Sequence, residues 1–144
     1  MIQTNVRSIA EQLVDIYYSE EYWIKNRMHP DEALEYHYKQ LEKGAIRVIV
    51  ELGVVLGYYQ LWKLNNEQVN RILAKQSFNE NTEDITHGDI AYLANLYVDK
   101  SFRNGSVFRR MYKMWKQDVK DCDTVVGIEQ KYRERIKLFK LKGI

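Results

Sequence analysis

The sequence predicts a mixed α/β (α+β) domain in which N-terminal helices precede a central sheet. Apolar residues recur at helical spacing over the first 43 residues, whereas runs rich in β-branched and aromatic residues follow from Ala45 onward. Residues 90–128 then read as strand, helix and strand, a pattern that implies a right-handed parallel crossover. Because the 144 residues are 45% hydrophobic and contain no repeat, we expect residues 1–144 to form a single domain.

Two helices and a hairpin are expected in the first half of the chain. Asn5–Tyr18 has the apolar spacing of an amphipathic helix, and Pro30–Lys43 begins with a proline suited to a first helical turn. Ala45–Leu52 and Val54–Leu64 are rich in strand-forming residues, and Gly53 between them marks a tight turn. These two runs predict an antiparallel hairpin.

The second half is expected to hold two buried strands and two longer helices. The polar segment Asn65–His87 is a long connection, with a short helix predicted around residues 67–75. Asp89–Val98 is almost entirely apolar or aromatic, as in a central strand buried on both faces. A helix over Gly105–Lys120, a short strand over Thr124–Ile128 and a basic helix over Lys131–Leu141 complete the order.

Several classes of protein are excluded by composition. No apolar run approaches the roughly 20 residues of a membrane span, and residues 1–7 do not resemble a signal peptide. The single cysteine, Cys122, excludes an internal disulfide and any cysteine-based metal cluster. The three histidines do not have the spacing of a metal-binding pair, so no metal site is predicted. We therefore expect a cytoplasmic protein with no membrane partner.

Charge is distributed unevenly along the chain. From Arg103 to the end there are twelve Lys or Arg residues against five Asp or Glu, a net +7, whereas the first 102 residues carry a net −5. A basic C-terminal part suits a phosphate-bearing ligand or another acidic partner, and it is equally compatible with solvated helix faces. No recognised nucleic-acid motif accompanies the charge, so nucleic acid is not expected as a partner.

One stretch after the predicted central strand resembles a known family. Residues 96–107 read LYVDKSFRNGSV: Leu96, Tyr97 and Val98 end a strand, an aromatic residue and Arg103 open a turn, and a helix follows. This order is similar to the central crossover of the GNAT (Gcn5-related) N-acetyltransferase superfamily. The tail, residues 138–144 (LFKLKGI), resembles the end of that family's last helix.

The resemblance implies a fold and a ligand. We expect a GNAT-like mixed sheet that binds acetyl-CoA or another acyl-CoA, with acyl carrier protein as a further thioester donor. The turn Arg103, Asn104, Gly105 and Ser106 would hold the pyrophosphate, because a helix N-terminus offers unpaired N–H groups and a glycine admits a phosphate close to the backbone. In this family the backbone of the preceding strand, here residues 96–98, binds the pantetheine arm.

The turn also departs from the family pattern. The expected glycine positions hold Ser106 and Phe108, while Gly105 comes one residue early. The bulk of Phe108 is expected to crowd the pyrophosphate.

Candidates for proton transfer are harder to select. For the base we consider His29, Glu51 and Asp89, each of which also suits an ordinary surface role. For the acid, Tyr97 and Tyr132 are candidates, because Phe139 stands where the family has its tyrosine; a structural aromatic role is open for both.

A fainter resemblance is to the toxin-activating lysine acyltransferases. The Asn-Gly turn at 104–105 and a histidine before the second helix, His29, match that branch, whose catalytic aspartate corresponds to Asn95 here.

Two functions follow from these observations. The first is an acyl-CoA-dependent N-acyltransferase, an acetyltransferase in the simplest case, acting on a small-molecule or protein amine. The alternative is a non-catalytic GNAT-like binding or assembly protein. Because the family continues into a final strand pair beyond the position of Ile144, we also expect that pair to be missing or replaced by a strand from a second copy, as in a homodimer.

Overall fold

The computed structural model describes residues 5–19, 28–74, 76–102, 105–128 and 136–139. The helices are α1 (Val6–Ser19), α2 (Pro30–Glu42), α3 (Asn66–Leu73) and α4 (Ser106–Asp118), with a short 3-10 turn, η2 (Lys100–Phe102). The strands are β1 (Ile46–Glu51), β2 (Val54–Leu64), β3 (Ile90–Val98), β4 (Thr124–Ile128) and β5 (Ile136–Phe139). The predicted order of elements is confirmed up to β4.

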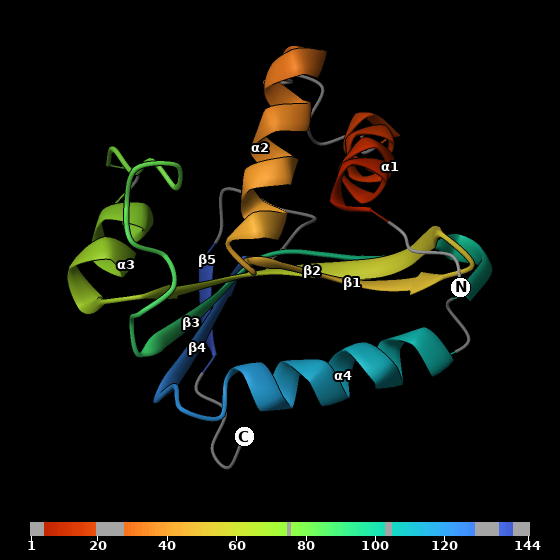
Figure 1. Cartoon of the computed structure of the whole chain (residues 1–144). Helices are drawn as coiled ribbons and strands as arrows, with labels where there is room; N and C mark the ends of the chain where they lie inside the picture. The colour runs from red at the N-terminus through yellow and green to blue at the C-terminus, as the bar shows by residue number, and fades with distance from the viewer. Residues whose placement is uncertain (1–4, 20–27, 75, 103–104, 129–135, 140–144) are drawn as a thin grey trace.

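The strands form one mixed sheet in the order β1-β2-β3-β4-β5. The pairs β1–β2, β2–β3 and β4–β5 are antiparallel, whereas β3 and β4 are parallel and joined through α4. Helices α1 and α2 cover one face of the sheet and α4 covers the other, as Figure 1 shows. The expected mixed α/β fold with a parallel crossover is therefore confirmed.

Each face of the sheet has its own core. On the α1–α2 face, Leu13 packs with Val55 and Tyr58 of β2. On the α4 face, Val107 and Met111 pack against Leu56 and Tyr59. Trp62, Leu64 and Tyr92 belong to a third cluster, which contains Val69 of α3 and Ile85. Because apolar side chains are buried on both faces of the sheet, helices hold the sheet in place from either side. This packing positions β3, on which the candidate site lies.

The C-terminal helix predicted over Lys131–Leu141 is wrong for residues 136–139. These residues form β5, which pairs antiparallel with β4 from Val125–Phe139 to Ile128–Ile136. The positive charges and apolar residues of this segment suit a helix face, but pairing with β4 satisfies backbone groups that an exposed edge would leave open. β5 therefore covers the edge of β4, and the resemblance of residues 138–139 to a helix end does not hold. The expected pairing with a second copy stays a prediction.

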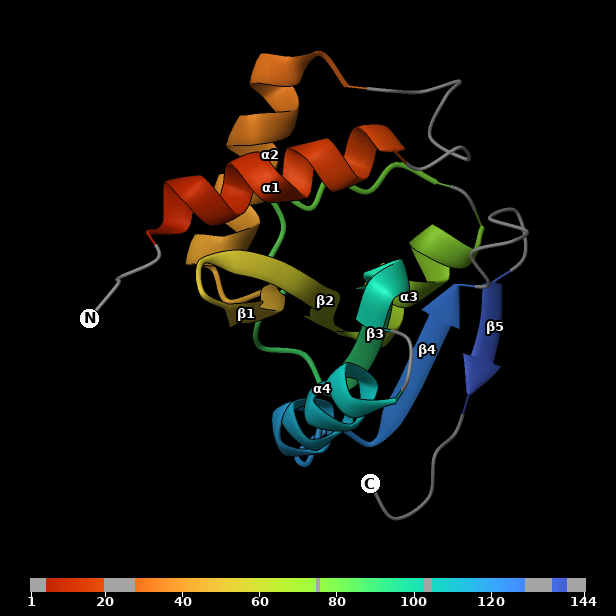
Figure 2. The ribbon, with the colours of Figure 1, turned by 90° about the vertical axis from the view of Figure 1, so that its right-hand side faces the viewer.

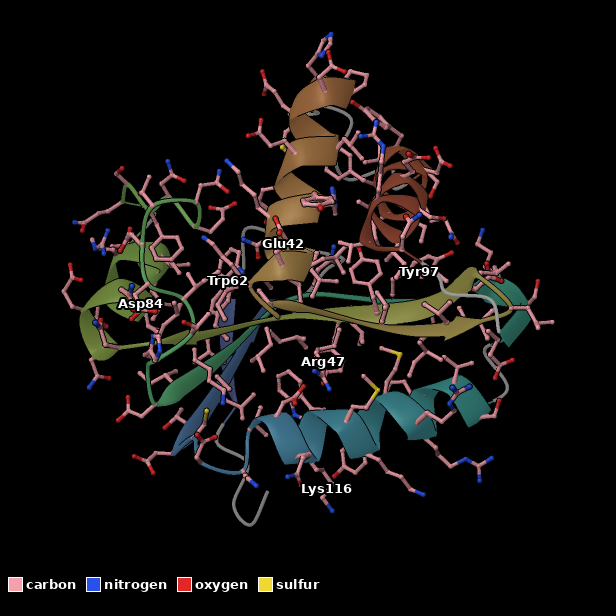
Figure 3. The ribbon with its side chains drawn as sticks, viewed as in Figure 1. Glu42, Arg47, Trp62, Asp84, Tyr97 and Lys116 are labelled. Atoms are coloured by element: carbon pink, nitrogen blue, oxygen red, sulfur yellow. The ribbon has the colours of Figure 1, made fainter. Side chains whose placement is uncertain are left out.

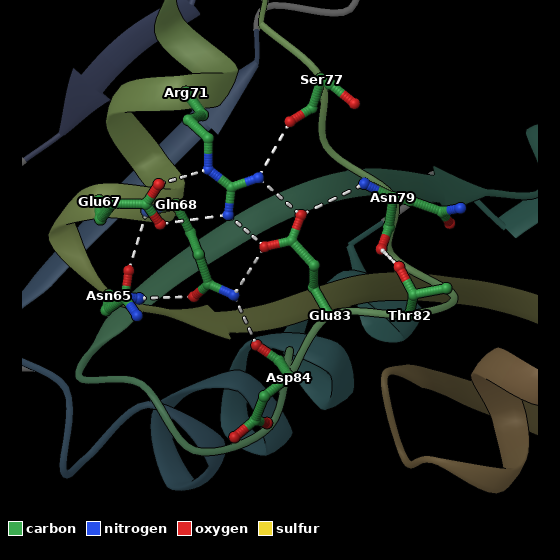
Figure 4. A network of polar contacts seen from close by, with 9 residues as sticks. All are labelled: Asn65, Glu67, Gln68, Arg71, Ser77, Asn79, Thr82, Glu83 and Asp84. Carbon is green, nitrogen blue, oxygen red and sulfur yellow. Dashed lines mark hydrogen bonds and ion pairs between the residues drawn. The ribbon is translucent and has the colours of Figure 1, made fainter.

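The long polar connection between β2 and β3 is held by a network around α3 (Figure 4). Asn65 and Gln68 form a reciprocal capping box at the start of α3. Arg71 pairs with Glu67 and Glu83 and donates to the Ser77 carbonyl at 2.9 Å. Gln68 Nε2 donates to the Asp84 carbonyl at 2.9 Å. The connection is thus anchored to α3 by side chains that the sequence shows only as a polar stretch.

Candidate functional site

The parallel pair at the centre of the sheet separates before β3 ends. The β3–β4 register runs from Ile90–Thr124 to Leu93–Gly127, whereas β3 continues to Val98. A bulge lies at this point, because Gln60 of β2 pairs with Asn95 while Leu61 pairs with Leu93. Since a bulge bends its strand and increases its twist, it directs the rest of β3 away from β4. Figure 2 shows the C-terminal ends of the two strands lying apart.

The prediction that β3 is buried on both faces holds only for its beginning. Ile90, Ala91 and Tyr92 are buried, whereas every residue from Leu93 to Val98 is only half-buried. The change occurs where the β3–β4 register ends. An apolar sequence predicted burial along the whole strand, but burial depends on neighbours that diverge at the bulge.

A side-chain bond stabilises the bulge. Asn95 Oδ1 accepts from the Leu96 backbone N–H at 2.9 Å, and Asn95 Nδ2 donates to the Tyr58 hydroxyl at 2.8 Å. Asn95 therefore holds backbone geometry at the position where the toxin-activating branch has an aspartate. The ring of Tyr97 stacks on Tyr58 with centroids 5.8 Å apart.

The backbone beyond the bulge points alternately to the two sides of β3. The Asp99 N–H donates to the Leu56 carbonyl of β2 at 2.8 Å, and Tyr97 is the register partner of Tyr58. By the alternation of an antiparallel ladder, Leu96 and Val98 then direct their backbone groups toward the β4 side. Of the three residues expected to offer backbone groups to pantetheine, these two have the suitable direction, but the N–H of Leu96 already donates to Asn95 Oδ1.

The turn between β3 and α4 presents a helix N-terminus. Gly105 is the N-cap residue of α4 with φ of 101°, a left-handed conformation that favours glycine, and it has no side chain with which to cap the helix. The first turn begins at Ser106 and contains no acidic residue. The predicted phosphate ligands Arg103 and Asn104 lie outside the described residues.

An apolar cavity of about 150 Å³ lies between α4 and the sheet. Its lining comes from Tyr59 of β2, Leu93 and Leu96 of β3, and Phe108, Met111, Tyr112 and Trp115 of α4. Phe108, expected to obstruct the turn, is 51% exposed and forms part of the cavity wall. No pattern in the sequence indicates this cavity, because its walls are apolar residues typical of a core.

One cavity wall is fixed by a partly buried polar contact. The Tyr59 hydroxyl donates to Asp118 of α4, and Arg47 Nε lies 3.3 Å from the same carboxylate. Burial, followed by the bond to Asp118, raises the pKa of Tyr59 above its ordinary value. Arg47 projects from the sheet toward α4 in Figure 3, whereas Tyr97 lies on the opposite face. Tyr59 therefore acts as a neutral, fixed wall.

The proton-transfer candidates are spread over the molecule. His29 caps α2, where its Nδ1 accepts from the Asp31 N–H at 3.3 Å, and its side chain is 67% exposed. Glu51 pairs with Arg110 near the start of α4. Tyr97 donates a long bond of 3.5 Å to Asp99. Asp89 directly precedes β3, and its carbonyl accepts from the Asp123 N–H at 2.9 Å. The last candidate, Tyr132, lies outside the described residues. Neither His29 nor Glu51 lines the apolar cavity.

Three solved structures are similar to this chain in overall fold. The loading GNATL domain of CurA from Lyngbya majuscula matches with a TM-score of 0.54 and 12% identity, over 88% of this chain and 62% of that one. An N-acetyltransferase from Staphylococcus aureus Mu50 matches with a TM-score of 0.50 and 12% identity, over 88% and 78%. Another protein of that strain, provisionally assigned as an acetyltransferase, gives 0.51 and 13%, over 81% and 71%. The chain has the GNAT fold.

At the level of sequence, no family model and no curated protein matches the chain. The likeness is therefore one of fold. In this chain, β3 diverges from β4 before it leads into the N-terminus of α4. Among the helices that the structure describes, none is long and apolar enough to cross a bilayer. Within the same residues, no cluster of three or more His, Cys, Asp or Glu side chains is arranged to hold a metal ion.

Proposed function

We propose that the protein is an acyl-CoA-dependent N-acyltransferase that transfers an acyl group to a small-molecule or protein amine. The observation that carries this proposal is the early end of the β3–β4 register, which opens the sheet next to the N-terminus of α4. The fold, which is shared with acetyltransferases, supports it.

The residues around this opening fit the two polar parts of CoA. The N–H groups at the start of α4 and the positive end of its dipole suit the pyrophosphate. Among the described residues, a Cβ atom on Gly105 would meet nothing within 4 Å, so no described side chain or backbone crowds this glycine. Arg103 would add a charged fork. Because the Leu96 N–H donates to Asn95, the Leu96 carbonyl and the backbone of Val98 would be the groups that meet the pantetheine amides.

Chemistry at this site requires mainly positioning. Bound acyl-CoA supplies an activated thioester, and the amine nitrogen bonds to its carbonyl carbon as the carbon–sulfur bond breaks. The amine loses one proton, for which His29, Glu51 and Asp89 are the candidate acceptors. The departing thiolate gains a proton, for which Tyr97 or Tyr132 is the candidate donor.

Two observations favour the alternative, a non-catalytic GNAT-like binding protein. Phe108 replaces a small residue at the phosphate turn, and both His29 and Glu51 already contact other polar groups at the surface. The alternative differs in a measurable way, because a binding protein would not release free CoA thiol in the presence of an amine.

Binding of CoA is tested by thermal shift and by calorimetry on the whole chain. We expect CoA and acetyl-CoA to raise the melting temperature, since a ligand that binds only the native state stabilises it by mass action. Arg103→Ala should weaken binding about tenfold, in line with the loss of a charge-assisted hydrogen bond. Arg7→Ala, which removes an exposed arginine of α1, is the matched control.

Catalysis is tested by following thiol release with a panel of amines. Release that depends on the amine supports the transferase. Tight CoA binding without such release would support the binding protein, and no binding at millimolar CoA would reject both uses of the site.

A further inference from the structure

The cavity beside α4 is unusual in being both apolar and open to solvent. Its described lining consists of aliphatic, thioether and aromatic side chains. Phe108 and Tyr112 at its rim are 51% and 53% exposed, although large apolar side chains are normally buried. An accessible hollow with such walls is suited to an apolar ligand.

The bulge in β3 creates the floor of this cavity. In a regular strand Leu93 and Asn95 would share a face, because side chains alternate. The extra residue, Ala94, shifts this alternation, so that Leu93 and Leu96 both pack on the α4 side. Asn95 turns instead to Tyr58. The cavity therefore begins where β3 leaves β4, beside the path proposed for the thioester.

The chemistry of the lining indicates which part of an acyl-CoA the cavity suits, the pantetheine arm or the acyl chain. Pantetheine contains two amides that need hydrogen-bond partners when buried. Leu93, Leu96 and Met111 offer no side-chain donor or oxygen acceptor, and the Tyr59 hydroxyl is bonded to Asp118. The other polar groups of the described lining are the hydroxyl of Tyr112, which lies at the exposed rim, and the indole N–H of Trp115, so the cavity offers few partners for two amides. A hydrocarbon chain needs no such partners and gains free energy from leaving water.

We infer that this cavity receives the acyl chain of the donor, so that the preferred substrate carries a medium-length acyl group rather than acetyl. The inference rests on the proposed function. A cavity of about 150 Å³ with walls of this kind has room for a group the size of benzene, which sets the chain at about six carbons.

The test measures the affinity of the whole chain for CoA, acetyl-CoA, hexanoyl-CoA and dodecanoyl-CoA by calorimetry. Each methylene that enters the cavity should tighten binding about fourfold, up to hexanoyl-CoA, and the gain should stop for dodecanoyl-CoA. Leu93→Phe, which fills the floor, should abolish the gain from acetyl-CoA to hexanoyl-CoA.

Tyr112→Ala provides a second variant at an exposed position, where folding is not at risk. It should reduce the chain-length gain, because part of the cavity wall is lost. Tyr38→Ala, an exposed tyrosine of α2 on the opposite face, is the matched control and should keep the full gain. These two variants decide the question if Leu93→Phe does not fold.

Three results would overturn the inference. Equal affinity for CoA, acetyl-CoA and hexanoyl-CoA would leave the proposed function standing and remove the acyl pocket. Equal losses of CoA and hexanoyl-CoA affinity in Leu93→Phe would assign the cavity to pantetheine. Absence of binding by any CoA species would remove the proposed function and this inference with it.

Discussion

Leu52 combines two unfavourable properties at the tip of the β1–β2 hairpin. Its φ of 50° lies in the left-handed region, and its side chain is 92% exposed. Gly53 follows with φ of 80°, so both turn residues have positive φ, as in the hairpin turns that favour Asn-Gly. Replacing a leucine in this conformation should relieve strain at little cost in packing.

We therefore expect Leu52→Asn to raise the free energy of unfolding by about 1 kcal/mol. Urea denaturation monitored by circular dichroism measures the change. Val54→Asn removes an exposed apolar side chain from the neighbouring strand position, and it should not stabilise. Equal stabilisation by both substitutions would attribute the effect to surface polarity and contradict the backbone explanation.

His37 makes stability depend on pH. It is buried on α2, where its Nδ1 lies 2.7 Å from the Ala33 carbonyl and its ring contacts those of Tyr17 and Tyr36. Burial lowers the pKa of His37 below its ordinary value of 6.5. The neutral form is thus favoured in the folded state, and below pH 6.5 the unfolded chain binds the proton more readily.

The contribution of His37 to the free energy of unfolding is complete above pH 6.5. It declines as the pH falls from 6.5 toward the lowered pKa of His37 in the folded state. His37→Gln should flatten the fall in unfolding free energy between pH 7 and pH 5. The exposed His87 provides the control, and His87→Gln should keep most of the wild-type slope. The slope is the readout, because the substitution at a buried position also changes stability at pH 7.

At the scale of elements, α4 depends on Gly57 for its close approach to β2. A Cβ atom at Gly57 would lie 2.9 Å from Met111 Sδ, 2.9 Å from the Tyr97 carbonyl oxygen and 3.1 Å from Val107 Cγ1. The methionine can move, but the backbone carbonyl of β3 has little freedom to do so.

Gly57→Ala should lower the free energy of unfolding by about 1–3 kcal/mol, as in other overpacked cores. In the background of Met111→Ala the same change should cost less, because one of the clashing groups is gone. A double-mutant cycle in chemical denaturation measures this coupling. Strict additivity of the two substitutions would refute the proposed contact.

The connection between β2 and β3 should open locally when its network is broken. Arg71 joins α3 to Glu83 on the far side of the connection. Arg71→Gln should therefore accelerate hydrogen exchange and proteolysis within residues 76–88 more than it lowers global stability. Arg7→Gln removes an exposed pair within α1 and should leave that region unchanged. Unaltered hydrogen exchange in Arg71→Gln would show that burial of Val69 and Ile85 is enough to hold the connection in place without the Arg71 network.

For the whole molecule, ligand binding should protect a defined part of the fold. Hydrogen exchange with saturating CoA should slow at Leu96, Val98 and the first turn of α4, while α1 and α3 stay unchanged. The pattern follows from the opening between β3 and β4, which lies where their register ends and β3 continues toward α4. Protection confined to α1 and α2 would place the ligand elsewhere and contradict the proposed site.

The sequence alone determined most of the helices and strands of this protein. Local patterns of apolar spacing and turn residues predict α1, α2, β1, β2, β3, α4 and β4. A short window of sequence therefore contains the information that specifies each of these elements. The resemblance around Leu96–Val107 likewise placed Gly105 and Ser106 at a helix start, where the structure has them.

Only the tertiary structure decided the features that depend on distant segments. β5 exists because β4 offers an edge, and the bulge at Ala94 is defined only by its register with β2. That bulge separates β3 from β4 and brings Leu93 and Leu96 to one cavity with Trp115. Such pairing carries no local signal, because strand register is fixed by contacts between residues far apart in the chain.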